Sequence, residues 1–124
     1  MKNPNYWLRK QANRKTGYPI ATIGYYGPND TFASKVAVGI IASEYRREPV
    51  ALKRWFSDEN DVRTNAEINS QILEFIRDHR AVRIAMVERI IGCPHEEGID
   101  YPEGELCPHC PFWHSVDRWT GEKL

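Results

Sequence analysis

Residues 64–76 read TNAEINSQILEFI, and this stretch decides how the rest of the chain is interpreted. Thr64 and Glu67 fit a capping box, in which Thr64 caps the third helical amide and Glu67 reaches back to the cap. Large apolar residues then recur at the spacing of one helical face: Ile68, Ile72, Leu73, Phe75 and Ile76. The stretch predicts an amphipathic helix that docks on a sheet.

Three strand-like segments precede this helix and one follows it. Residues 20–26 and 35–41 are rich in β-branched and aromatic residues, and the turn formers Gly27-Pro28-Asn29-Asp30 separate them. Pro49 opens a third candidate strand over residues 50–56, and residues 81–91 form a fourth that Gly92 ends. Because neither face of residues 35–41 is strongly polar, we expect that strand to be covered on both sides.

The predicted fold class is therefore α+β: a three-stranded antiparallel meander, one amphipathic helix, a fourth strand, and a C-terminal loop lobe in which cysteines lie beside histidines, a pattern that predicts zinc binding. The length of 124 residues suits one domain with a small appendage. Residues 1–17 are expected to form an irregular basic arm, residues 18–91 the α+β core, and residues 92–124 the zinc-binding lobe packed on that core. The arm contains no acid and five basic residues: Lys2, Arg9, Lys10, Arg14 and Lys15.

Composition limits the class of protein. Hydrophobic residues make up 41% of the chain and charged residues 27%, which is ordinary for a globular protein. No apolar run approaches the length of about 18 residues that spans a bilayer, and basic residues interrupt the N-terminus where a signal segment would be apolar. These features predict a cytoplasmic protein that does not contact a membrane. The formal net charge is zero, so no global field attracts nucleic acid.

The three cysteines lie within one short segment beside histidines. Cys93, Cys107 and Cys110 occupy 18 consecutive residues, and an odd number is unusual for a disulfide scaffold. Zn²⁺ prefers four sulfur and imidazole donors arranged in a tetrahedron. Cys107-Pro108-His109-Cys110 is a Cys-x-x-Cys turn that lets both sulfurs face one ion, and it resembles the zinc knuckle of many unrelated small zinc sites. The pattern predicts a Zn²⁺ site built on Cys93, His95, Cys107 and Cys110.

Other assignments of the cluster remain open at the level of sequence. His114 competes with His95 as the fourth ligand, because a helical turn over residues 110–114 would bring it to Cys110. His109 lies inside the knuckle, where side chains usually point outward. An iron–sulfur cluster is an alternative without a matching cysteine spacing, and three free buried cysteines are another.

Two resemblances suggest catalysis. His95-x-Glu97 followed by Cys107-x-x-Cys110 resembles the pattern of the zinc deaminases, which implies that Glu97 is the proton shuttle. The chain departs from that family at Leu106, where the family has Pro, and only nine residues separate the two halves. The order of strands and helix also resembles the opening of the RNase H-like fold, which implies carboxylates on the first strand. Residues 20–26 contain none, whereas Glu67 on the helix and Glu88 near the fourth strand could supply the others.

We therefore expect a small zinc-binding domain that acts as a binding or adaptor module rather than as an enzyme. Nucleic acid and protein are both open as partners. Basic residues beside aromatic ones are the candidates for nucleic-acid contact: Lys2, Arg9, Lys10, Arg14, Lys15, Lys53 and Arg54. Residues 96–105 instead contain five acids and no base, which suits a basic partner or a solvated loop. The alternative function is a zinc-dependent hydrolase or deaminase-like enzyme that uses His95, Glu97, Cys107 and Cys110.

Overall fold

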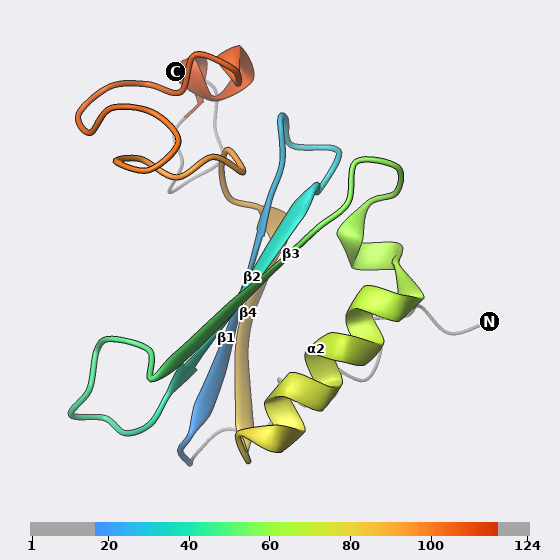
Figure 1. Cartoon of the computed structure of the whole chain (residues 1–124), viewed down its shortest axis with the longest axis vertical. Coiled ribbons are helices and arrows are strands. Elements are labelled where there is room, and N and C mark those ends of the chain that lie inside the picture. Colours follow the sequence, from blue (N-terminus) through green and yellow to red (C-terminus); the bar gives the residue numbers. More distant parts are fainter. Residues whose placement is uncertain (1–16, 117–124) are drawn as a thin grey trace.

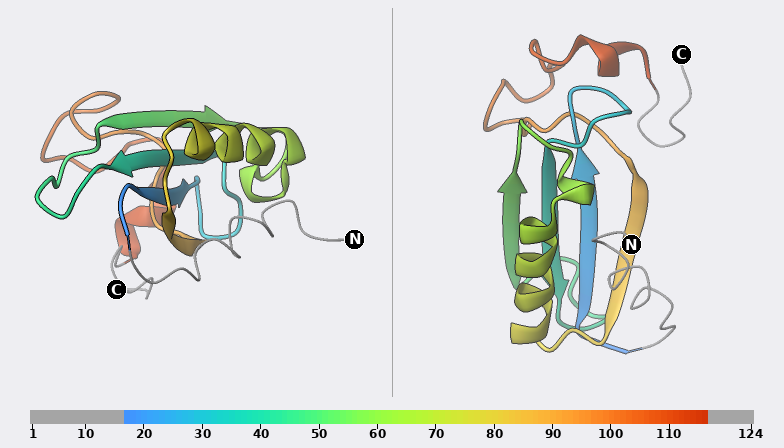
Figure 2. Two further views of the ribbon diagram at one scale, coloured as in Figure 1. Left: turned by 90° about the horizontal axis from the view of Figure 1, so that it is seen from below. Right: turned by 90° about the vertical axis from the view of Figure 1, so that its right-hand side faces the viewer.

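The computed structural model describes residues 17–116, and the predicted basic arm lies almost wholly outside them. The described chain is an α+β domain with one four-stranded sheet in the order β3-β2-β1-β4 (Figure 1). One long helix covers one face of this sheet, and a lobe of loops stands at one end (Figure 2). The predicted fold class is confirmed. Among the described residues, no helix has the length and apolar character needed to cross a membrane.

The predicted meander is formed by β1 (Ile20–Tyr26), β2 (Lys35–Ile41) and β3 (Ala51–Phe56), which pair antiparallel in chain order. β4 (Arg83–Ile90) then lies on the other side of β1 and runs parallel to it. β2 is an inner strand and is buried along most of its length, as expected from its two apolar faces. The carboxyl ends of β1 and β4 point toward the same end of the sheet, where the chain continues into the C-terminal lobe.

The helix α2 (Ala66–Asp78) packs across one sheet face and closes the main core. Ile68, Ile72 and Ile76 are buried on its apolar stripe. Each buried side chain of this size contributes roughly 1.5–3 kcal/mol, which is ample to hold the helix on the sheet. The side chains of the core come from every strand and from the helix: Ala21, Ile23, Tyr25, Val36, Val38, Ile40, Trp55, Val62, Ile68, Ile72, Ile76, Ile84 and Ile90.

The helix begins one residue later than the capping-box prediction. Asn65 is the N-cap, and its side-chain oxygen accepts a hydrogen bond from the Ile68 amide at 3.0 Å. Thr64 instead ends the short 3₁₀ helix η1 (Val62–Thr64), and its hydroxyl donates to the Asp61 carbonyl. Asn is at least as good an N-cap as Thr. Because Thr64 belongs to η1, Asn65 is the residue that caps α2.

The two faces of β3 differ in burial. Trp55 faces α2, where its indole N–H donates to Gln71 at 2.9 Å and its ring meets Phe75 edge-on. Leu52 and Phe56 share the opposite face, and both are exposed. The face of the sheet away from α2 is therefore partly open, and the C-terminal lobe borders it.

Candidate metal centre

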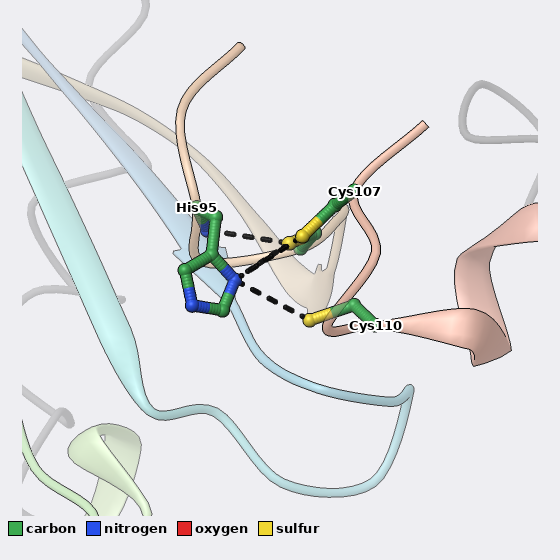
Figure 3. A group of neighbouring side chains, drawn as sticks. His95, Cys107 and Cys110 are labelled. Atoms are coloured by element: carbon green, nitrogen blue, oxygen red, sulfur yellow. Dashed lines mark hydrogen bonds between the residues drawn. The ribbon is translucent and has the colours of Figure 1, made fainter. Parts of the chain in front are cut away.

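Four side chains from two loops meet at one point in the C-terminal lobe. Cys93 and His95 come from the segment that follows β4, and Cys107 and Cys110 come from the turn before η2 (Pro111–Ser115). One donor atom from each of the four lies within 4.8 Å of all the others, and this group could hold a metal ion. The His95 ring points between the sulfurs of Cys107 and Cys110 (Figure 3).

The imidazole nitrogen is the centre of this arrangement. Nδ1 of His95 lies 3.2 Å from the Cys93 sulfur, 3.4 Å from that of Cys107 and 3.5 Å from that of Cys110. A ring nitrogen carries either one proton or one lone pair, so it can make one good hydrogen bond and not three. A tetrahedral Zn²⁺ with ordinary bond lengths would place its nitrogen and sulfur ligands roughly 3.5 Å apart. The contacts therefore fit donors that share a cation better than donors that share a proton.

Short-range hydrogen bonds shape the two ligand loops. The His95 amide donates to the Cys93 sulfur at 3.3 Å, which turns both side chains of the Cys-x-His segment to one side. The Cys110 amide donates to the Cys107 carbonyl at 3.4 Å and closes the Cys-x-x-Cys turn. Cys107 and Cys110 are buried, whereas Cys93 and His95 are partly exposed.

The structure separates His95 from the other two candidate histidines. His114 is exposed, and its Nε2–H donates to the Cys107 carbonyl at 2.7 Å, so its ring supports the knuckle through the backbone. His109 is exposed inside the knuckle, with its ring centre 5.5 Å from that of His95. Neither histidine belongs to the four-residue group.

Burial raises the pKa of the Cys93 thiol, and the neighbouring Cys110 and Cys107 sulfurs raise it further against the opposing hydrogen bond from the His95 amide. Burial likewise raises the pKa of Cys110, together with the repulsion from Cys107 and against the hydrogen bond to Cys93. Three thiolates packed this closely repel one another unless a cation sits among them. Metal binding at this site must therefore displace protons, and it will weaken as the pH falls.

Two basic residues of the sheet fasten the first ligand loop. Lys35 is 3% exposed, donates to the Pro94 carbonyl at 2.9 Å and lies 3.7 Å from the Glu96 carboxylate. Arg54 donates to the same carboxylate through Nη2 at 2.6 Å and through Nε at 3.1 Å. Sequence reasoning missed these contacts. One signal was present, because a lysine on a strand with two apolar faces needs a polar partner once the strand is buried.

The second ligand loop is fastened by Trp113. Its indole N–H donates to the Gly27 carbonyl at 2.7 Å, and both groups are buried. The Gly27 amide in turn donates to the Gly92 carbonyl at 2.9 Å, at the start of the lobe. Gly27 has no substitute here, because a Cβ atom would collide with the Phe32 carbonyl oxygen. The β1–β2 turn thus supports both halves of the centre.

The acidic loop of residues 96–106 is compact and turn-rich, as its glycines and proline predict. Gly98 and Gly104 both adopt positive φ, at 81° and 86°. Acidic side chains stabilise the loop itself: the Asp100 carboxylate accepts the Glu96 amide at 2.7 Å, and the Glu97 carboxylate accepts the Gly104 amide at 3.3 Å. Glu97, which the deaminase resemblance makes a proton shuttle, is exposed and engaged with its own loop.

The candidate nucleic-acid residues do not form one patch among the described residues. Lys53 and Arg54 are consecutive on β3 and point to opposite faces of the sheet. Arg54 is paired with Glu96, and the Lys53 ammonium lies 5.2 Å from the centre of the Trp55 ring. The remaining candidates lie outside the described residues: Lys2, Arg9, Lys10, Arg14 and Lys15.

The carboxylates that the RNase H-like resemblance requires are not brought together. Glu67 is exposed on α2, the side chain of Glu88 lies outside the described part of the chain, and β1 contains no acid. The resemblance is therefore confined to the order of the elements.

Comparison with known proteins gives the chain no relatives. No protein-family model matches it, and no curated protein or solved structure is significantly similar to it. A functional argument has to start from the four-residue group and its surroundings.

Proposed function

We propose that this chain is a small zinc-binding module in which the metal orders the C-terminal lobe, so that the lobe can bind a partner. The observation that carries the proposal is the contact of one imidazole nitrogen with three cysteine sulfurs, at 3.2–3.5 Å. Three thiolates and one neutral imidazole in a tetrahedral arrangement are typical of structural zinc sites. An iron–sulfur cluster would spread the four ligands over two or four irons, and would therefore place some of them farther apart than donors that share one ion.

A structural metal suits the site better than a catalytic one. A catalytic Zn²⁺ keeps one coordination position for water or substrate. In the proposed set Cys93 supplies the fourth donor, and no position remains open. The deaminase-like alternative leaves Cys93 without a role and asks Glu97 to leave its hydrogen bond with Gly104. We therefore do not propose an enzyme.

The partner that we favour is a protein. The lobe carries acidic residues, and Arg54, which lies beside it, already pairs with Glu96. Contact with nucleic acid through the basic arm is the competing proposal. A salt titration of RNA and DNA binding separates the two, because phosphate contacts predict a steep loss of affinity with salt that removal of residues 1–17 would flatten.

The metal itself is tested by comparing the three histidines of the lobe. Purified protein should contain one Zn²⁺ per chain by elemental analysis, and Co²⁺ in its place should show the visible absorption of a tetrahedral thiolate site. His95→Asn should lose the metal, whereas the matched variants His109→Asn and His114→Asn should retain it. Metal-free protein, or retention of zinc in His95→Asn with loss in His114→Asn, would refute the proposed ligand set.

A further inference from the structure

A groove with a volume of about 600 Å³ lies beside the metal centre. It runs between the β1–β2 turn, the end of β3 and the metal lobe. Phe32, Phe56 and Pro94 supply apolar lining, and Asp58 and Asp100 supply carboxylates. The groove therefore combines an apolar wall with negative charge, on the open face of the sheet.

Phe56 is the main apolar feature of this groove. It is 64% exposed, although the preceding residue of the same strand, Trp55, is buried. The ammonium of the chain's own Lys35 lies 5.7 Å from the centre of the Phe56 ring and 5.4 Å from that of Tyr26. The same corner of the molecule thus already holds one lysine by contact with aromatic rings and a carboxylate, which is a favourable environment for a cation.

The charge around the groove is mainly negative, and the lysine in its lining, Lys35, is already paired with Glu96. Residues 92–116 contain no Lys or Arg and five acids: Glu96, Glu97, Asp100, Glu103 and Glu105. Glu96 is neutralised by Arg54 and Lys35, but the other four are exposed and have no basic partner among the described residues. Asp58 is exposed as well and makes no ion pair within residues 17–116. Because the whole chain has zero net charge, this is a local field and not a general attraction for cations.

We propose that this groove binds a lysine- or arginine-rich segment of a partner protein. The aliphatic stem of a basic side chain lies along the Phe56 ring, and its charged end meets the Asp58 carboxylate, while the exposed acids of the lobe attract the flanking basic residues. The inference rests on the proposed zinc-ordered lobe, because residues 94–110 form one wall. A nucleic-acid strand fits poorly here, since its phosphates would face the exposed acids.

The experiment uses the full zinc-loaded chain and fluorescence anisotropy. The probe is a fluorescein-labelled peptide of twelve residues in which lysine and arginine alternate with serine and glycine. A peptide with glutamate in place of each basic residue, a single-stranded RNA and a duplex DNA are measured in parallel. We expect saturable binding of the basic peptide alone, which weakens as salt is raised.

Matched variants locate the binding to the groove. Asp58→Asn should lower the affinity for the basic peptide about three- to five-fold. Glu44→Gln removes the same charge from the loop at the opposite end of the sheet, and it should change the affinity less than about two-fold. Phe56→Ala should weaken binding about five- to ten-fold, and Tyr45→Ala, which removes an aromatic ring that is 88% exposed in that distant loop, should have no effect. Zinc content and circular dichroism establish that each variant is folded.

Each result decides between the proposals. If zinc-loaded protein does not bind the basic peptide at low salt, the proposed peptide site is refuted, but the proposed metal-binding module is not. If the purified protein lacks stoichiometric zinc, the metal-binding module itself is refuted. If Asp58→Asn and Glu44→Gln lower the affinity for the peptide equally, the peptide is attracted by overall charge and not by a specific site. That result overturns the proposal. Tighter binding of RNA or DNA than of the peptide assigns the partner to nucleic acid.

Discussion

The sheet and helix of residues 17–91 and the metal lobe of residues 92–116 are held together by different forces. The first region buries a continuous set of large apolar side chains between α2 and the sheet. The second has one short 3₁₀ helix as its regular structure, and its buried apolar residues are Cys107, Cys110, Trp113 and Val116. Two of these four are themselves candidate metal donors. Apolar burial can fold the first region alone, whereas the second lacks the core to do so.

If the four donors hold a metal ion as proposed, that ion and a few directed contacts take the place of a core in the lobe. Lys35 and Arg54 hold the first ligand loop, and Trp113 holds the second. Polar contacts of this kind each contribute on the order of 1 kcal/mol, while a structural Zn²⁺ contributes roughly 10–16 kcal/mol of apparent binding energy at neutral pH. The lobe should therefore depend on the metal, and the core should not.

Removal of the metal should have the largest effect. In Cys107→Ser, or in the native chain after chelation, amide hydrogen exchange should become fast throughout residues 92–116 and remain slow in β1, β2 and α2. The reason is that the loop contacts cannot replace the free energy of metal binding. Hydrogen exchange measured by mass spectrometry compares the two regions, and elemental analysis of the same sample establishes whether the metal is present.

His114→Asn is the control for this experiment, because it alters the lobe without removing a proposed donor. Its zinc content should match that of the native chain, and any faster exchange should be confined to the Cys107–Cys110 turn, where the hydrogen bond from His114 is lost. Slow exchange in a metal-free lobe would show that the contacts suffice without the ion. Loss of protection in β2 and α2 as well would show that the two regions fold as one unit.

A cavity in the core should have the next largest effect. Ile72 is fully buried on α2, and Ile72→Ala should lower the free energy of unfolding by about 2–5 kcal/mol because it loses apolar contacts and leaves a void. Ile72→Val should cost only about 1 kcal/mol. Urea unfolding gives both values. Zinc content before unfolding should be unchanged, and a variant that loses zinc while α2 stays folded would contradict the separation of the two regions.

Trp113→Phe tests whether docking of the lobe is distinct from metal binding. It removes the buried donor to the Gly27 carbonyl and leaves that oxygen without its partner, which costs about 1–3 kcal/mol. Exchange should rise at residues 92–94 and 111–116 while the zinc stays bound. Phe112→Leu, at the neighbouring and only partly buried ring, should cost less than about 1 kcal/mol. Loss of zinc from Trp113→Phe would mean that docking and ligation cannot be separated.

The core could be predicted largely from local pattern. Strand alternation and the stripe from Ile68 to Ile76 are statements about which face is buried, and each strand of the meander falls within one residue of its expected bounds. The register of the strands and the neighbour of β4 were not accessible, because they depend on residues far apart in the chain. The parallel pairing of β1 with β4 is one such feature. The position of Trp55 under the helix is another, since a strand sequence does not reveal which of its faces meets a partner.

The metal centre was partly accessible for a chemical reason. Sulfur and imidazole donors at short spacing have few other uses, so the meeting of Cys93 and His95 with the Cys-x-x-Cys turn could be expected. The contacts that hold the centre on the sheet could not be expected from the sequence. Lys35 and Arg54 are separated from Glu96 by about sixty and forty residues, and such pairs carry no local signal. The fold places His95 and not His114 in the four-residue group, whereas spacing alone had left both open.

The smallest of these effects concerns Asp61, which joins the β1–β2 connection to η1 within the first region. Its carboxylate accepts the Ala33 amide at 2.9 Å and pairs with Arg63 at 2.6 Å. Burial alone would raise the pKa of Asp61, but the Arg63 side chain and the amides of Ala33 and Arg63 outweigh burial and hold the pKa below its ordinary value of 3.8. We expect Asp61→Asn to lower the free energy of unfolding by about 1 kcal/mol at neutral pH.

The pH dependence of that loss distinguishes the carboxylate from the metal site. Because the folded-state pKa of Asp61 lies below the unfolded value, its stabilisation is complete above about pH 3.8 and disappears as the pH falls through the folded pKa. The metal leaves at low pH from both proteins alike, so the difference between Asp61→Asn and the native chain reports Asp61 alone. Urea titrations should show a constant gap from pH 7 to pH 5 that closes toward pH 3. A gap that instead closes where zinc is released would place the effect of Asp61 in the lobe, and the two regions would then be coupled more closely than their contacts imply.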